Sequence, residues 1–232
     1  MNVIINSIKG GAGGIVPVVS ENVVTGYGYN KMSCVVPDGV TSIGQSAFYE
    51  CSSLGSITLP DSLTSIGQSA FSYCFALESI TLPDSLTSIG VSAFSSCIAL
   101  KSITFPDSLT SIGFRAFEDC IALESITLSD SLPYFSPASF GTNGNKNFPQ
   151  MSTLTIPSGW KPTSADMQGN RIIMMAFSGL SVDAVTAAAN NLGNWTDAGN
   201  ACTVYLNSNI QSDLSSVQSA LEAKGYTVTY VV

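Results

Sequence analysis

The 232-residue sequence contains no histidine, and only 10% of its residues are charged. Roughly a quarter of the residues in soluble domains carry charge, so small polar residues must supply most of the wetted surface here. Without histidine, the Ser-His-Asp and Cys-His arrangements of hydrolases are excluded. Neither a complete phosphate-binding loop nor a nucleophile-elbow motif is present. The sequence therefore predicts a protein that is not an enzyme and that holds no cofactor.

Basic residues are also few, since eight Lys and Arg stand against sixteen Asp and Glu and give a net charge of −8. The eight are scattered singly, so nucleic acid and anionic membranes are not the expected partners. No apolar run approaches the roughly 18 residues that span a bilayer. Within Met1–Ser20 a single cation, Lys9, is followed by glycines rather than by an apolar stretch. We therefore recognise no signal peptide.

What the sequence has is a 23-residue unit that recurs along its middle. Proline, phenylalanine and cysteine return at this spacing, at Pro37, Pro60, Pro83 and Pro106, at Phe48, Phe71, Phe94, Phe117 and Phe140, and at Cys51, Cys74, Cys97 and Cys120. A fixed period of this length indicates a solenoid, in which each unit buries its apolar face against its neighbours. Solenoids present broad surfaces more often than they enclose reaction centres, which favours a binding function.

Each unit predicts one coil with a strand and a turn. The triplet 57–59 (Ile-Thr-Leu) alternates apolar and polar residues, which predicts a half-buried strand with Thr58 pointing outward. Pro60 and Asp61 then predict a turn. A second extended piece follows at 63–66, and the segment 70–77, with apolar residues roughly three apart, predicts a helical or 3₁₀ turn.

The segments outside the repeats differ in style. Residues 1–32 are rich in glycine and valine and predict a cap or arm, with short strands near 16–19 and 22–25, that covers the first coil. Residues 33–157 hold the repeats. Residues 158–232 predict larger strand–helix coils that close the solenoid, with helices at 181–192 and from 212 or 213 to 224. We expect about six short coils and two larger ones.

The repeat core A-F-x-x-C-x-x-L-x-S-I-T-L-P resembles the BspA-like class of leucine-rich repeats over residues 33–157. The resemblance implies an α/β repeat fold: a leucine-rich-repeat solenoid with a parallel sheet on one face, helical or 3₁₀ turns on the other, and strand–helix closing coils at the C-terminus. Characterised members are surface adhesins, and the class also occurs in bacteriophage structural proteins.

Two functions follow as expectations from that resemblance. The first is a non-enzymatic binding or adhesion protein that recognises a protein or glycan on a cell surface. The second is a structural or decoration component of a phage particle or extracellular assembly, anchored by its N-terminus to other virion or assembly proteins. The corresponding location is the extracellular surface or the virion.

One candidate binding surface is a row of threonines that should line the outer face of the sheet: Thr58, Thr81, Thr104, Thr127 and Thr155. A flat surface rich in hydroxyl groups suits a glycan or an extended protein. Threonine also favours strands for purely structural reasons, so both interpretations stay open.

A second candidate is the row Phe75, Ile98 and Ile121. If these side chains point outward, they form an apolar stripe that marks a partner or a contact between copies of the chain. The alternative is that they pack beneath the C-terminal segment or their own turns. Apolar surface on the sheet face would favour recognition, whereas a lateral stripe or an apolar N-terminal end would favour assembly.

The cysteine and aspartate rows each have a structural and a functional interpretation. Cys51, Cys74, Cys97 and Cys120 should stack about 5 Å apart, which suits buried free thiols and would also admit disulfides between coils. An aspartate follows each turn position, and such a row starts solvated turns or could bind calcium. We expect free thiols and solvated turns, hence no metal site. The aspartates are Asp38, Asp61, Asp84, Asp107 and Asp130.

Overall fold

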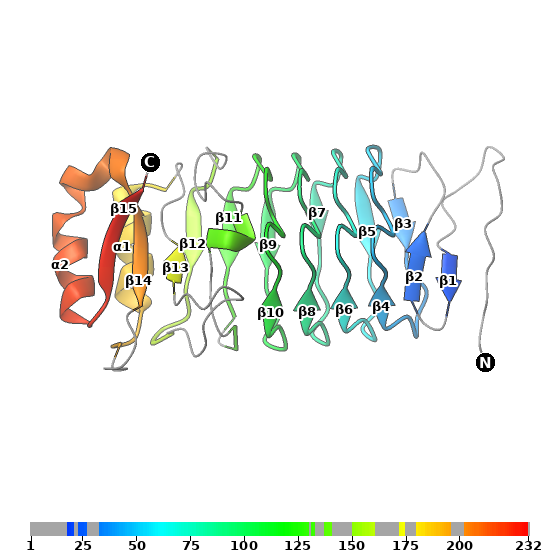
Figure 1. Ribbon diagram of the computed structural model, residues 1–232, viewed down its shortest axis with the longest axis horizontal. Helices are drawn as coiled ribbons and strands as arrows, with labels where there is room; N and C mark the ends of the chain where they lie inside the picture. Colours follow the sequence, from blue (N-terminus) through cyan, green and yellow to red (C-terminus); the bar gives the residue numbers. More distant parts are fainter. Residues whose placement is uncertain are drawn as a thin grey trace.

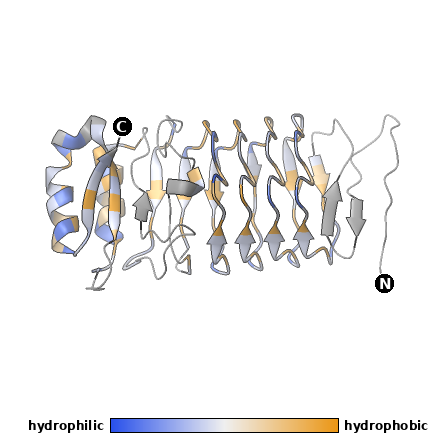
Figure 2. Ribbon diagram, in the orientation of Figure 1, coloured by the Kyte–Doolittle hydropathy of each residue, from blue (hydrophilic) through white to orange (hydrophobic). Residues whose placement is uncertain are grey.

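The chain folds into an elongated solenoid whose coils stack along one axis from the N-terminal to the C-terminal end (Figure 1). The computed structural model describes residues 18–20, 23–26, 33–129, 131–132, 137–140, 150–160, 172–174, 180–195 and 202–231. Figure 2 shows hydrophobic segments that recur at the same place in successive coils. This recurrence is what a core built only from contacts between neighbouring coils produces.

The first four 23-residue repeats each form one coil with two short strands. The strands at the Ser-Ile-Thr position of the repeat, called the Ser-Ile-Thr strands below, are β3 (Ser33–Val35, with Cys and Val in place of Ile and Thr), β5 (Ser56–Thr58), β7 (Ser79–Ile80), β9 (Ser102–Thr104), β11 (Ser125–Thr127) and β12 (Thr153–Thr155, Thr-Leu-Thr). The second strands are β4 (Ser42–Ile43), β6 (Ser65–Ile66), β8 (Ser88–Ile89) and β10 (Ser111–Ile112). Ile57 pairs with Ile80 and Ile66 with Ile89, both in parallel. The predicted period and register are therefore confirmed.

The two strand rows differ in continuity. The second strands form one sheet in the order β1-β2-β4-β6-β8-β10, whereas the Ser-Ile-Thr strands form two sheets, β3-β5-β7 and β9-β11-β12. After the fifth coil the register shifts by five residues, since Ile126 pairs with Leu154. The predicted leucine-rich-repeat solenoid with a parallel sheet is confirmed, and the extended piece predicted at 63–66 contributes a second sheet.

The third side of the coil is a ladder of turns. Ser46, Phe48 and Glu50 donate their N–H groups to carbonyls of the next coil at 2.7–2.8 Å, whereas the intervening residues bond to a carbonyl three residues back. The local bonds are of the 3₁₀ type. Ser46 and Glu50 have φ of 55° and 60°, however, and left-handed residues interrupt a helix. The predicted 3₁₀ turn is thus a run of single turns that also bonds to its neighbouring coil.

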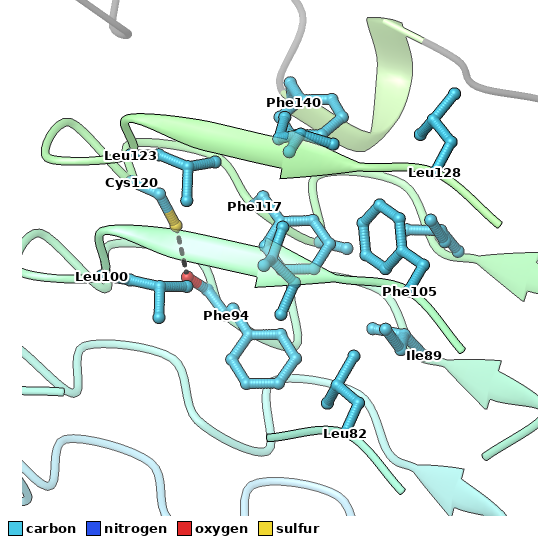
Figure 3. Packing of buried hydrophobic residues seen from close by; sticks show 14 of the residues in the cluster. Leu82, Ile89, Phe94, Leu100, Phe105, Phe117, Cys120, Leu123, Leu128 and Phe140 are labelled. Carbon is cyan, nitrogen blue, oxygen red and sulfur yellow. Dashed lines mark hydrogen bonds between the residues drawn. The ribbon is translucent and has the colours of Figure 1, made fainter. Parts of the chain in front are cut away.

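The core beneath this ladder is a stack of phenylalanine rings. The rings of Phe48 and Phe71, Phe71 and Phe94, and Phe94 and Phe117 have centroids 5.0, 5.2 and 5.3 Å apart and lie within 6° of parallel. All four side chains are fully buried. Figure 3 shows the end of the stack, where Phe140 from the 3₁₀ helix η1 (Pro137–Phe140) covers Phe117.

The cysteine row packs beside the rings as free thiols. All six cysteines of the chain are buried and none forms a disulfide. The Sγ atoms of Cys74, Cys97 and Cys120 donate to a phenylalanine carbonyl of the preceding coil at 3.2, 3.1 and 3.2 Å, and Figure 3 shows the last of these bonds. Burial raises the pKa of the Cys97 thiol to about 12. The expectation of buried free thiols is therefore confirmed.

Strands cover the N-terminal end of the solenoid. β1 (Val18–Ser20) and β2 (Val23–Gly26) form an antiparallel pair. β2 then pairs in parallel with β4 through Val23 and Val24. This pairing satisfies backbone groups that the first coil would otherwise expose at a sheet edge, as the sequence predicts. The glycine-rich segment before β1 lies outside the described residues.

The C-terminal segment alternates strands and helices. Its elements are β13 (Ile172–Met174), α1 (Val182–Asn191), β14 (Thr203–Asn207), η2 (Ser208–Asp213), α2 (Ser215–Ala223) and β15 (Thr227–Val231). The three strands form a parallel sheet, and the helices lie at the far end of the solenoid (Figure 1). The side chain of Ser181 accepts from Ala184 N and caps α1, as predicted.

One predicted boundary in this segment is wrong. The second helix begins at Ser215 rather than at Ser212 or Asp213, because those two residues belong to η2. Among the described residues, every helix is too short or too polar to cross a bilayer.

Candidate interaction surface

The threonine row of the Ser-Ile-Thr strands faces solvent. Thr58, Thr81, Thr104 and Thr155 are exposed and Thr127 is half-buried. A serine or Thr153 stands two residues before each of them, so the face presents two hydroxyl rows. Val35 takes the threonine position in the first coil, opposite Thr58, and is 68% exposed. The outward placement of the five threonines is therefore as predicted, whereas the exposed valine escaped sequence reasoning.

A second threonine row shows what structural hydroxyl groups look like in this fold. Thr64, Thr87 and Thr110 donate to the backbone carbonyl of the residue one coil earlier, at 2.9, 2.9 and 3.0 Å. By contrast, the side chains of Thr58, Thr81 and Thr104 form no hydrogen bond with the described part of the chain. The outward hydroxyl groups are thus available to a ligand.

The row of Phe75, Ile98 and Ile121 also points outward. These side chains are 43%, 40% and 43% exposed. They are therefore not buried beneath the C-terminal segment, and their role as a binding stripe stays a prediction. They stand one coil apart at the corner where the ladder of turns meets the Ser-Ile-Thr strands.

Two tyrosines enlarge this surface, Tyr73 in the same coil as Phe75 and Tyr49 in the coil before it. Tyr49 and Tyr73 are about as exposed as Phe75. Their rings meet edge to face at a centroid distance of 5.5 Å, and the rings of Tyr73 and Phe75 do so at 6.0 Å. We call the five residues Tyr49, Tyr73, Phe75, Ile98 and Ile121 the apolar ridge. Sequence reasoning missed the tyrosines as site residues, although both lie in rows whose residue changes from coil to coil.

Backbone conformation explains why the ridge projects. Tyr73 has φ of 63°, in the left-handed region, and Phe75 N bonds back to its carbonyl oxygen at 2.9 Å. The chain therefore reverses sharply after the inward-facing Cys74 and drives the next side chain outward. A bulky residue costs about 1–2 kcal/mol in this conformation, which recurs at the equivalent Ser96 and Asp119 and so belongs to the repeat.

Acidic residues and ion pairs lie beside the apolar ridge. Burial, followed by the Glu50 carboxylate, raises the pKa of Tyr49. Lys101 pairs with Glu78 at 3.0 Å, and Arg115 with Glu118 at 3.5 Å. The turn aspartates of the first four coils are exposed, and Asp130 lies outside the described residues. Among the described residues, no group of three or more Cys, Asp or Glu side chains lies close enough together to hold a metal ion.

The family is shown by a match to the repeats themselves. The model of the BspA type leucine rich repeat region matches residues 27–158 in six copies. The chain belongs to this family. Leucine-rich repeat proteins generally bind proteins, and the repeats themselves are generally not enzymes.

Solved structures share the fold of these BspA-type repeats. A leucine-rich repeat protein of T. pallidum is 23% identical with a TM-score of 0.62, over 94% of this chain and 96% of that protein. A leucine-rich repeat protein of Bacteroides ovatus is 29% identical with a TM-score of 0.50, over 75% of this chain and 42% of that protein.

The pneumococcal vaccine antigen PcpA is 16% identical with a TM-score of 0.55, over 93% of this chain and 46% of that protein. The chain thus spans less than half of the Bacteroides and pneumococcal proteins. Among curated proteins, none matches the sequence.

Proposed function

We propose that the chain is a non-enzymatic recognition protein that binds a protein on a cell surface through the outside of its BspA-type repeats. One observation carries the proposal of a binding function: the apolar ridge, whose five large side chains are 38–43% exposed. Its lateral position also suits assembly, which is the alternative considered below. Isolated exposed apolar residues are ordinary, whereas a contiguous group marks an interaction site. Aromatic residues are also enriched among those that contribute most to binding.

The hydroxyl face supports a second ligand class for the same function. Its free threonine side chains suit the hydroxyl-rich surface of a glycan, as the sequence predicts. We place the protein ligand first because the ridge supplies apolar area, which drives association, whereas exposed hydroxyl groups exchange one hydrogen bond for another.

The two surfaces can be separated in one experiment. Fluorescently labelled protein is titrated onto intact bacterial cells and onto immobilised mucin, as wild type and as two triple variants. Phe75→Ser/Ile98→Ser/Ile121→Ser removes part of the ridge, and Thr58→Lys/Thr81→Lys/Thr104→Lys covers the hydroxyl face. We expect saturable binding that falls at least tenfold in the ridge variant alone. Loss of binding in the threonine variant alone would assign a glycan ligand. If neither variant weakens binding, or wild type does not bind, the proposal is refuted.

The assembly alternative has one observation in its favour. The apolar surface forms a lateral ridge and does not lie on the sheet face. A lateral position is where a structural component would carry it. In that case the ridge joins copies of the chain or a neighbouring assembly protein. Sedimentation of wild type and of the ridge variant tests this. An oligomeric wild type and a monomeric ridge variant would favour assembly. The phage-particle version of this alternative stays a prediction.

An extracellular surface location belongs to the same proposal. Its support is an analogy of fold with the pneumococcal vaccine antigen and the low proportion of charged residues. Protease treatment of intact source cells tests it, because a surface protein is cleaved while cytoplasmic controls survive.

A further inference from the structure

Charged residues surround the apolar ridge, and most of them are acidic. Glu50 follows Tyr49 directly, and Glu118 and Asp119 occupy the two tyrosine rows near Ile121. A third row lies three residues beyond the ridge, on the side of the Ser-Ile-Thr strands, and consists of Glu78, Lys101 and Glu124. The border therefore holds five carboxylates against two cations, Lys101 and Arg115.

The two cations at this border are already engaged. Lys101 pairs with Glu78 and Arg115 with Glu118. The five carboxylates outnumber these two cations and, together with the chain's net charge of −8, give the ridge an acidic rim. A partner that places cations on both sides of an apolar stripe would complement this rim, because opposite charges steer association and fix register.

Ridge side chains recur at the spacing of a helix rather than of a strand. Successive coils lie 5.0–5.3 Å apart where the phenylalanine rings measure it. An amphipathic α-helix returns its apolar face about every 5.4 Å along its axis. Alternate residues of an extended strand return about every 6.7 Å. Over the two coil steps from Phe75 to Ile121, a helix therefore stays in register within about 1 Å, whereas a strand drifts by roughly 3 Å.

A second copy of the chain fits the rim poorly. Its two described α-helices contain no basic residue, and each contains one acidic residue. Docking either helix on the ridge of another copy would bring carboxylates toward carboxylates. The charge pattern therefore favours a foreign partner over self-association.

We propose that the apolar ridge binds a cationic amphipathic helix, laid along the solenoid axis with its apolar stripe on Tyr73, Phe75, Ile98 and Ile121. Basic side chains on either edge of that helix meet the acidic rim. This inference rests on the proposed recognition function and names its partner's chemistry. Because the ridge is small beside a standard protein interface, we expect affinity in the micromolar range and a dependence on salt.

A designed peptide tests the proposal directly. The probe is a fluorescein-labelled 18-residue peptide of Leu and Lys, with Leu at i, i+3, i+4 and i+7 so that it forms one apolar stripe. Two control peptides have the same composition in scrambled order and the same pattern with Glu for Lys. Fluorescence anisotropy is measured against the intact chain at low and at 300 mM salt.

The expected result has three parts. The amphipathic cationic peptide binds at least tenfold more tightly than either control peptide. The variant Phe75→Ser/Ile98→Ser/Ile121→Ser weakens binding at least tenfold, and Ile98→Ser alone weakens it by a smaller factor. The control Thr58→Ala/Thr81→Ala/Thr104→Ala leaves binding unchanged. Glu50→Gln/Glu124→Gln, which leaves the Lys101–Glu78 and Arg115–Glu118 pairs in place, weakens binding about threefold at low salt and has little effect at 300 mM.

Two results would overturn the inference: equal binding of the scrambled peptide, or equal binding by the ridge variant. Failure here is distinguishable from failure of the proposed function. If cells still bind in a manner that depends on the ridge, only the chemistry assigned to the partner is wrong. If neither cells nor peptides depend on the ridge, both proposals fall.

Discussion

The inner and outer residue rows of the solenoid differ in how much they vary from coil to coil. Inside, the phenylalanine row returns the same residue to the same place, so that Phe94 meets Phe71 on one side and Phe117 on the other. Where an inner residue changes it stays apolar, as with Cys34 beside Ile57. Outside, the ridge rows change, with Ser52 replaced by Phe75, Ile98 and Ile121 in the following coils. Stacking requires apolar neighbours inside and asks nothing of a solvated corner. Large apolar residues at that corner therefore point to a contact beyond the fold.

The largest effect is expected from breaking the inner stack. Phe94→Ala should lower the free energy of unfolding by about 3–5 kcal/mol, as for buried aromatic residues generally, because the cavity borders two rings. Urea denaturation measures the loss. A loss below about 1 kcal/mol would show that the coil register is wrong.

High pH should weaken the same inner region through its thiols. Burial raises the pKa of Cys97 from 9.0 to about 12, and the pKa values of Cys74 and Cys120 are also raised. The unfolded chain ionises above pH 9 while folded Cys97 keeps its proton, so stability is full below pH 9 and falls until about pH 12.

For Cys97 alone the fall between pH 8.5 and pH 11 should be roughly 2–3 kcal/mol. Urea denaturation in a reducing buffer measures it, and Cys97→Ala supplies the control because it lacks this titration. An identical pH dependence in wild type and in the variant would contradict the assignment.

A single lysine should stabilise the closing segment, where no repeated row supports the fold. Lys224 Nζ donates to the carbonyls of Ala189, Asn190 and Leu192 at 3.0, 3.0 and 2.7 Å and so caps the C-terminal end of α1. Lys224→Met should destabilise the chain by about 1–2 kcal/mol, since a cation at this end also meets the helix dipole. Hydrogen exchange should show the loss in α1 and not in the repeats. Uniform loss across both regions would refute the local role.

A smaller effect should separate stability from binding at Tyr73. Tyr73→Gly relieves the left-handed conformation but removes two edge-to-face ring contacts, so the two effects on stability should largely cancel while binding to cells weakens. Ser96→Gly is the matched control, because Ser96 has φ of 61° at the same position one coil later. It should stabilise the chain by about 0.5–1 kcal/mol without loss of binding. Weaker binding in both variants would mean that the turn conformation, not the tyrosine ring, is required.

The repeat period made the inner rows predictable from the sequence. Alternation at 57–59 predicted which residue of each strand points inward, and the phenylalanine and cysteine rows followed from the spacing. The ladder of turns was not predictable in detail because Ser46 and Glu50 are neither glycine nor asparagine, the usual signals of a left-handed residue. Tyr49 and Tyr73 lie in different rows, so their contact depends on a geometry that spacing does not contain. The boundaries near residues 32 and 157 stay predictions.

The central claim is that the inner rows hold the fold while the ridge is apolar surface that the fold can do without. Ile98 and Ile103 offer the most direct test, since both lie in one repeat and are 40% and 2% exposed. The measurement is the free energy of unfolding of Ile98→Ser and of Ile103→Ser in urea. The account predicts a loss of about 1 kcal/mol or less for Ile98→Ser and above about 3 kcal/mol for Ile103→Ser. Equal losses would contradict it, because Ile98 would then belong to the core.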